Sequence, residues 1–103
     1  MYVVLVDWTV SASDAPQFAA LLAEQARNSL ENEVDCHVFD VCSDPEAQGS
    51  FTLYEVYSNA AAFQVHLESA HMAKFAPQAD ALTLSKSVRI LLRLADGSSG
   101  PPV

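Results

Sequence analysis

The order of strand-like and helix-like segments constrains the fold of this chain more than any other feature. Four segments have the alternating or continuous apolar pattern of β-strands, over residues 2–10, 35–43, 50–57 and 87–94. Two others place apolar residues three and four apart, as helices do, over residues 11–32 and 60–82. The resulting order, β-α-β-β-α-β, is that of the split βαβ arrangement. We therefore predict an α+β, ferredoxin-like fold with an antiparallel sheet.

One domain accounts for the predicted elements. The chain has 103 residues, half of them hydrophobic, which is enough for a single core. We assign the domain to residues 1–95 and predict a flexible C-terminal tail over residues 96–103, where small, polar, Gly and Pro residues dominate. Pro77 lies inside the second helical segment and predicts a break there between two short helices.

The first strand carries apolar residues on both faces, which usually means that both are covered. One face holds Tyr2, Val4, Val6 and Trp8. We expect the helices to cover the other face and to leave this one open. An exposed apolar area of that size is unusual in a monomer, so we predict a homodimer packed sheet to sheet.

Charge and hydropathy exclude several classes of partner. The chain has 5 Lys and Arg against 13 Asp and Glu, a formal net charge of -8. Nucleic acids and anionic membranes attract clustered cations, so neither is an expected partner. No apolar run approaches the roughly 18 residues of a membrane span. The first ten residues lack the basic start and cleavage site of a signal peptide, and we expect a soluble, cytoplasmic protein.

The two cysteines are not expected to form a disulfide. On one regular strand Cys36 and Cys42 share a face but lie about 20 Å apart, at roughly 3.3 Å per residue. A disulfide needs Cα atoms within about 7 Å. We interpret both cysteines as small buried apolar residues in a reducing compartment.

Glu55, His66 and His71 are the strongest catalytic candidates. Glu55 shares a strand face with apolar residues, and a buried carboxylate needs a partner. Two interpretations stay open: a salt bridge across the sheet or the dimer, for example to Arg89 or Arg93, or an acid that lines a pocket or orients a histidine. His66 falls on the inward helix face, and histidine suits proton transfer near neutral pH. Histidines hydrogen-bonded within a core would show the same pattern.

A metal site is the competing interpretation of the histidines. Residues five apart on one helix diverge by roughly 140°, whereas zinc-binding pairs prefer a spacing of four. We predict no metal, although a break between His66 and His71 would change that geometry.

Other polar positions have weaker interpretations. Asp7 either contacts a pocket histidine or lies at the sheet end in water, and His37 either lines a pocket or an interface. Asn28 and Ser29 either cap the first helix or reach the site. The residues expected to line a substrate pocket are Asp7, Asn28, His37, Phe39, Tyr57, Phe63, Met72 and Phe75. No phosphate loop, dinucleotide fingerprint, serine-hydrolase motif or CxxC is present, so no nucleotide, flavin or nicotinamide cofactor is expected.

Two segments, NSLENEVDCHVFDV (28–41) and FTLYEVYSNAAAFQVHLESAHMAKF (51–75), resemble the antibiotic biosynthesis monooxygenase family. The resemblance extends over about residues 1–94. The first motif is partial, because Val34 and Asp35 replace its usual Pro-Gly and Val38 a common Arg. Glu55, His66 and His71 fall on polar positions of the second motif, and Asn28 matches the Asn of the first.

The resemblance implies a dimeric α+β barrel and a cofactor-independent monooxygenase acting on a quinol or polycyclic phenol with O2. In such a reaction the protein supplies an apolar cavity, a base and hydrogen bonds to the developing oxyanion. Two alternatives stay open: an isomerase of a phosphorylated dione, and a non-catalytic dimer that binds a small ligand. The isomerase would need cations for the phosphate. The available ones are Arg27, Lys74, Lys86, Arg89 and Arg93. Haem-degrading relatives carry a Trp near His66 and a His near Ala76; neither is present, so haem is not expected.

Overall fold

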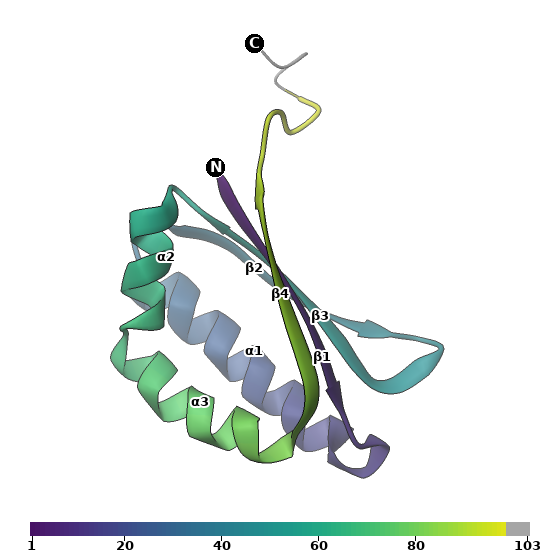
Figure 1. Ribbon diagram of the computed structural model, residues 1–103. Helices are drawn as coiled ribbons and strands as arrows, with labels where there is room; N and C mark the ends of the chain where they lie inside the picture. The colour runs from purple at the N-terminus through teal and green to yellow at the C-terminus, as the bar shows by residue number, and fades with distance from the viewer. Residues whose placement is uncertain (99–103) are drawn as a thin grey trace.

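The computed structural model describes residues 1–98, so the last part of the predicted tail, residues 99–103, lies outside the described residues. The elements are β1 (Tyr2–Val10), a short 3-10 turn η1 (Ala12–Asp14), α1 (Ala15–Asn32), β2 (Cys36–Asp44), β3 (Ala47–Tyr57), α2 (Ala60–Leu67), α3 (Ala70–Leu82) and β4 (Thr83–Leu92). All three α-helices lie on one side of the sheet (Figure 1). The predicted α+β fold and order of elements are confirmed.

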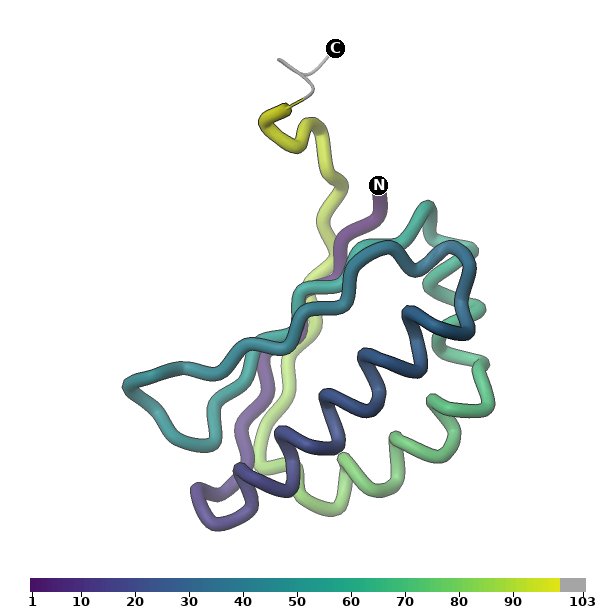
Figure 2. The backbone as a smooth tube through the Cα atoms, turned by 180° about the vertical axis from the view of Figure 1, so that it is seen from behind, coloured from purple at the N-terminus to yellow at the C-terminus, as the bar shows by residue number. Residues whose placement is uncertain are grey.

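The sheet is antiparallel, with strand order β2-β3-β1-β4. β2 and β3 form a hairpin whose tip extends beyond the helices (Figure 2). The register aligns Glu55 of β3 with Val4 of β1, and Val4 with Ile90 of β4. This strand order places β4 at an edge, where all of its residues after Thr83 are exposed.

The helices cover the sheet face opposite to the one predicted. Val4, Val6 and Trp8 are buried in the core beneath the helices, where the Trp8 ring meets those of Phe18 and Phe75 edge-on, at 5.2 and 5.9 Å between centroids. The expectation that this face stays open is therefore wrong. Alternation sorts a strand's residues into two sets, but both sets of β1 are apolar, so it does not say which set receives the helices.

The break in the second helical segment occurs at Glu68–Ser69, and the predicted break at Pro77 is wrong. Ser69 is extended, and its side chain accepts a hydrogen bond from the backbone N–H of Met72, which caps α3. Pro77 lies inside α3 on its exposed side, where its ring displaces no core residue. A capped start at Ser69 therefore breaks the segment, and α3 continues through the proline.

A register shift in β2 separates the two cysteines. Cys36 pairs with Tyr57 and Val38 with Val56, so His37 is an extra residue between them. This bulge reverses the alternation: Cys36 is buried, whereas Cys42 is exposed. The prediction that both share a face and are buried is wrong. Both thiols are free, as predicted.

β4 begins four residues earlier than predicted. Val10 pairs with Thr83 beyond a register shift, and the Trp8 indole N–H donates to the Thr83 hydroxyl at 2.7 Å.

Across the described residues, no helix is long and apolar enough to span a membrane.

Candidate functional site

A cleft with about 430 Å³ of empty space lies between the sheet and the helices α2 and α3. Its walls are mainly aliphatic and aromatic, which is typical of small-molecule sites. Its polar groups are Gln25, Glu55, His66 and Lys86, together with the indole of Trp8. Its apolar residues are Val4, Val6, Leu53, Phe39, Phe63, Leu67, Met72, Phe75 and Val88.

Glu55 is the carboxyl group of this cleft. It projects from β3 between Phe39 and Val4 in the register, and the hydroxyl of Tyr57 donates to its Oε1 at 2.6 Å. Burial raises the pKa of Glu55 to about 7, although the Tyr57 hydrogen bond and the charge of Lys86 both lower it. Glu55 is therefore a carboxyl group that exchanges its proton near neutral pH.

Neither Arg89 nor Arg93 pairs with Glu55 across the sheet of this chain. Arg93 donates instead to the hydroxyl of Tyr54 at 3.1 Å, and Arg89 lies opposite Leu5 in the register. Leu5 and Tyr54 belong to the sheet face away from the helices, because alternate residues of a strand point to opposite faces.

His66 enters the cleft from α2 and is 3% exposed. Its ring stacks on Phe63 at 5.9 Å and 16°, and lies 5.9 Å from the Phe39 ring. Its Nδ1 lies 3.0 Å from Oε2 of Glu33. Burial lowers the pKa of His66, and the hydrogen bond and charge of Glu33 oppose that shift.

The hydrogen bond to Glu33 selects the tautomer of His66. A carboxylate oxygen only accepts, so Nδ1 of a neutral His66 carries the proton and Nε2 keeps its lone pair. Within the described residues Nε2 has no hydrogen-bond partner. Among the described residues, the one fully enclosed side-chain polar atom without a partner is Oε1 of Glu33, so Nε2 of His66 is not fully enclosed. Nε2 is therefore an acceptor open to the cleft that His66 lines.

His71 binds the same carboxylate from the other side of the helix break. Its Nε2 lies 2.6 Å from Oε2 of Glu33, and the Ser29 hydroxyl lies 3.4 Å from each histidine. Because α2 ends at Leu67 and α3 begins at Ala70, the break overcomes the divergence expected of residues five apart on one helix. His71 does not line the apolar cleft.

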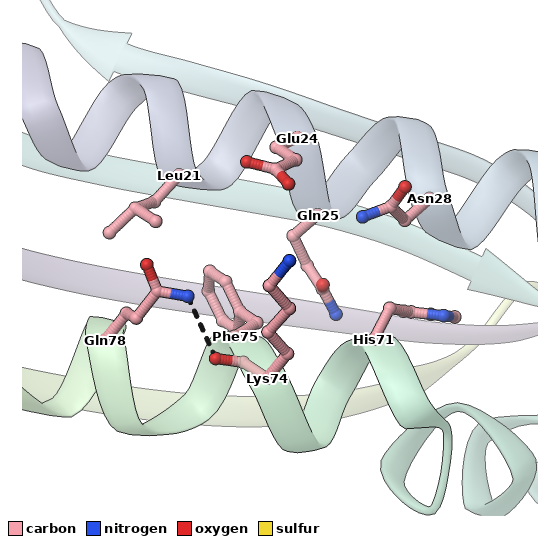
Figure 3. A pocket seen from close by; sticks show the side chains of 8 residues that line it. All are labelled: Leu21, Glu24, Gln25, Asn28, His71, Lys74, Phe75 and Gln78. Carbon is pink, nitrogen blue, oxygen red and sulfur yellow. Dashed lines mark hydrogen bonds between the residues drawn. The ribbon is translucent and has the colours of Figure 1, made fainter.

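His71 lines a second, more polar pocket between α1 and α3, with about 320 Å³ of empty space. Glu24 and Asn28 face this pocket from α1, and His71 and Lys74 from α3 (Figure 3). Gln25 and Phe75 line both pockets and so form the wall between them.

Glu33, His66 and His71 are also a donor set that could hold a divalent metal ion, because one ligand atom from each lies within 4.8 Å of the others. Two atoms bound to one zinc ion at about 2.0–2.1 Å lie roughly 3.3 Å apart in tetrahedral geometry. The 2.6 Å from His71 Nε2 to Glu33 Oε2 is shorter and is that of a strong N–H···O bond. The arrangement is therefore a hydrogen-bonded cluster in which a carboxylate orients two imidazoles.

The structure brings together only part of the predicted set. Phe39, Phe63, Met72 and Phe75 line the apolar cleft with Glu55 and His66. The fully buried Tyr57 is not among the lining residues and contacts Glu55 instead.

Three predicted pocket residues lie away from the apolar cleft. Asp7 is exposed and accepts from the Thr52 hydroxyl at 2.7 Å, so the solvent interpretation of Asp7 holds and its contact with a histidine is not formed. His37 is exposed in the bulge, 2.6 Å from the Ser58 hydroxyl. Asn28 lines the polar pocket instead.

Sequence reasoning missed Glu33, the role of Ser29, and Gln25, Trp8 and Lys86. Glu33 sits within the first family-like segment, and that position was the available signal. Capping is wrong for Ser29: α1 continues to Asn32, and Ser29 is completely buried beside the histidines.

Comparison with known proteins supports one family and one fold. A sequence model described as antibiotic biosynthesis monooxygenase matches residues 1–78. A solved structure from Nitrosomonas europaea, described provisionally as an antibiotic biosynthesis monooxygenase, is 22% identical, with a TM-score of 0.87 over 92% of this chain and 100% of that one. The protein Rv0793 of Mycobacterium tuberculosis is 21% identical, with a TM-score of 0.83 over 92% and 96% of the two chains. At these identities the likeness concerns the fold. The comparison with curated proteins found no match.

Proposed function

The chain belongs to the antibiotic biosynthesis monooxygenase family, and from this premise we propose that it oxygenates a quinol or polycyclic phenol with O2, without a cofactor. The observation that carries the proposal is the state of His66. Its Nδ1 is held by Glu33, and its Nε2 is an unpaired acceptor in an apolar cleft. That is the geometry of a general base for a hydroxyl group bound among aromatic side chains.

The proposed reaction begins with proton transfer. The substrate O–H bond breaks, the proton goes to Nε2 of His66, and an electron-rich phenolate remains. The phenolate gives one electron to O2, and the two radicals combine into a C–O bond. The resulting peroxide anion takes the proton back from Nε2 of His66, and the hydroperoxide so formed, which carries hydrogen on the same carbon, loses water to leave a carbonyl. One oxygen atom of O2 thus enters the product, and the other leaves as water.

The cleft supplies what this sequence needs. Phe39, Phe63 and Phe75 offer aromatic faces for a flat ring. Lys86, whose Nζ lies 4.4 Å above the Trp8 ring, is the one cation among the lining residues and would stabilise a developing oxyanion. Glu55, with a pKa of about 7, would donate a hydrogen bond to a substrate oxygen when protonated.

The test is O2 consumption with reduced quinols and polycyclic phenols on dialysed, chelator-treated protein. We expect uptake above the spontaneous rate, reduced about 100-fold or more in His66→Gln, as for loss of a general base. The matched control is His37→Gln, since that histidine is exposed and outside the cleft. Equal rates in the two variants would contradict the proposal.

The two alternatives have less support. An isomerase of a phosphorylated dione needs several cations around the phosphate, and among the lining residues of the apolar cleft Lys86 stands alone. A non-catalytic binding dimer would bind phenols in the same cleft without O2 uptake, which the same assay detects.

We also propose that the protein is a homodimer. The edge strand β4 exposes large apolar side chains, with Leu84 70%, Val88 52% and Leu92 69% exposed. An exposed apolar edge strand of this kind favours association. Light scattering coupled to size exclusion should give twice the chain mass of 11.1 kDa, and a monomer across the micromolar range would contradict this proposal.

A further inference from the structure

His66 and His71 share one carboxylate but face different compartments. His66 lines the apolar cleft, and His71 lines the polar pocket between α1 and α3 (Figure 3). His71 also lines an open hollow near Glu68 and Ser69. The side chains of His66 and His71 are 4% and 14% exposed, so the second histidine is the one nearer to solvent.

Glu33 depends on the two histidines for a compensating positive charge. Within residues 1–98, its only ion-pair partners are the two imidazoles, and its Oε1 is buried without a partner. One carboxylate neutralises one imidazolium. A second imidazolium, with ring centroids 6.1 Å apart, would be repelled in a region of low dielectric constant.

We propose that Glu33 couples the two histidines, so that His66 takes a proton from the substrate in the apolar cleft while His71 releases one into the polar pocket. This inference rests on the proposed function, because the substrate supplies the first proton. The exchange keeps one positive charge beside the one carboxylate throughout. The substrate O–H bond breaks and an Nε2–H bond forms on His66. The Nδ1–H bond of His71 then breaks, and its proton passes to water in the polar pocket.

The surroundings favour this direction of transfer. Glu24, Asn28 and Lys74 line the polar pocket, so a proton that leaves His71 enters a polar compartment rather than the apolar cleft. Glu68 lines the open hollow that His71 also borders. Toward the sheet, the ionisable groups that interact with Glu33 are Cys36, Glu55 and Tyr57. The pKa of Cys36 is raised to about 12 by burial, and burial also raises that of Tyr57, so neither adds charge near neutral pH.

The coupling is measurable without any ligand. The pKa of His66 is followed by nitrogen-detected NMR in wild type, His71→Gln and His37→Gln. In His71→Gln the new side chain keeps an amide N–H donor for Glu33 but carries no charge, so the pKa of His66 should rise when the competing cation is lost. His37→Gln should leave it unchanged. An unchanged pKa of His66 in His71→Gln would overturn the proposal, and His71→Asn provides a second variant if the first does not fold.

The second arm uses 4-nitrophenol, a phenol that O2 does not oxidise and whose ionisation is visible by absorbance. Calorimetry in two buffers of different ionisation enthalpy gives the number of protons released on binding. We expect about one proton per phenolate formed in wild type and about none in His71→Gln. Equal release in both proteins would overturn the coupling. If 4-nitrophenol does not bind, the assignment of the cleft to phenols fails, and the NMR titration alone decides the coupling.

Discussion

Glu33 and Glu55 are two buried carboxyl groups with opposite kinds of partner. Glu33 faces two imidazoles, at 3.0 and 2.6 Å, either of which can become a cation. Glu55 faces the Tyr57 hydroxyl at 2.6 Å, which is neutral, and its pKa is raised to about 7 by burial. The comparison shows two ways to satisfy a buried carboxyl group: imidazoles that can carry a compensating positive charge, or a neutral hydroxyl that donates a hydrogen bond.

The largest expected effect comes from Glu33→Gln. An amide would leave two buried imidazole N–H groups competing for one carbonyl oxygen, beside an NH2 group without an acceptor. We expect a loss of about 3 kcal/mol in the free energy of unfolding and a large fall in O2 consumption, because His66 loses the group that orients it. Urea denaturation and the O2 assay measure both. Glu31→Gln, at an exposed position in the last turn of α1, is the matched control. A Glu33→Gln protein as stable and active as this control would remove Glu33 from the site.

Glu55→Gln should remove a pH dependence of stability that the wild type shows. The folded-state pKa of Glu55, about 7, lies above its ordinary value of 4.5. The folded state therefore binds the proton more tightly, and the free energy of unfolding falls as pH rises from about 4.5 to about 7. The full difference is about 3 kcal/mol. Glu55→Gln should lack this fall and exceed wild type in stability at pH 8, as judged by urea denaturation.

His66 contributes a slope of opposite sign to the free energy of unfolding as a function of pH. The contribution of Glu55 is therefore obtained from the difference between Glu55→Gln and the wild type. Its folded-state pKa lies below the ordinary value, so its contribution to stability is lost as pH falls below about 6.5. Subtracting the wild-type curve from that of Glu55→Gln cancels the part due to His66. Glu46→Gln, on the exposed hairpin, should give a flat difference curve. A flat curve for Glu55→Gln as well would mean that Glu55 keeps an ordinary pKa.

The same two residues show what the sequence could and could not predict. Glu55 was identifiable because a carboxyl group interrupts a period-two apolar pattern, and that pattern is local. Glu33 follows an amphipathic helix and looks like an exposed C-terminal residue. It is buried because its carboxylate contacts His66 of α2 and His71 of α3, while its backbone N–H bonds to the carbonyl of Ser29. The contacts of Glu33 with His66 and His71 were not predictable either, because they depend on the helix break at Ser69. Pro77 gave a stronger local signal for a break at a different position.

Tyr57→Phe should give an intermediate effect that sharpens the contrast. Removing the hydroxyl leaves Glu55 without its hydrogen-bond donor, so the pKa of Glu55 should rise further. We expect a loss of about 1–2 kcal/mol in the free energy of unfolding. Urea denaturation between pH 5 and 8 gives both quantities. Tyr54→Phe is the control, because that hydroxyl lies on the open sheet face beside Arg93. If both variants behave alike, Tyr57 does not govern the carboxyl.

The smallest expected effect comes from Lys86→Met. Lys86 is exposed on the edge strand, and its charge lowers the pKa of Glu55 only as a secondary influence. Its removal should raise that pKa and change stability by less than about 0.5 kcal/mol. Lys86→Arg keeps the charge and should leave the pKa where it is, and about 0.5 M salt should move the wild type toward the Met variant by screening. A shift shared by Met and Arg would instead trace the effect to lost packing on Trp8. The pKa of Glu55 would then depend on side-chain packing around the cleft and not on the charge of Lys86. That result would sharpen the contrast with Glu33, whose two histidine partners can themselves carry a charge.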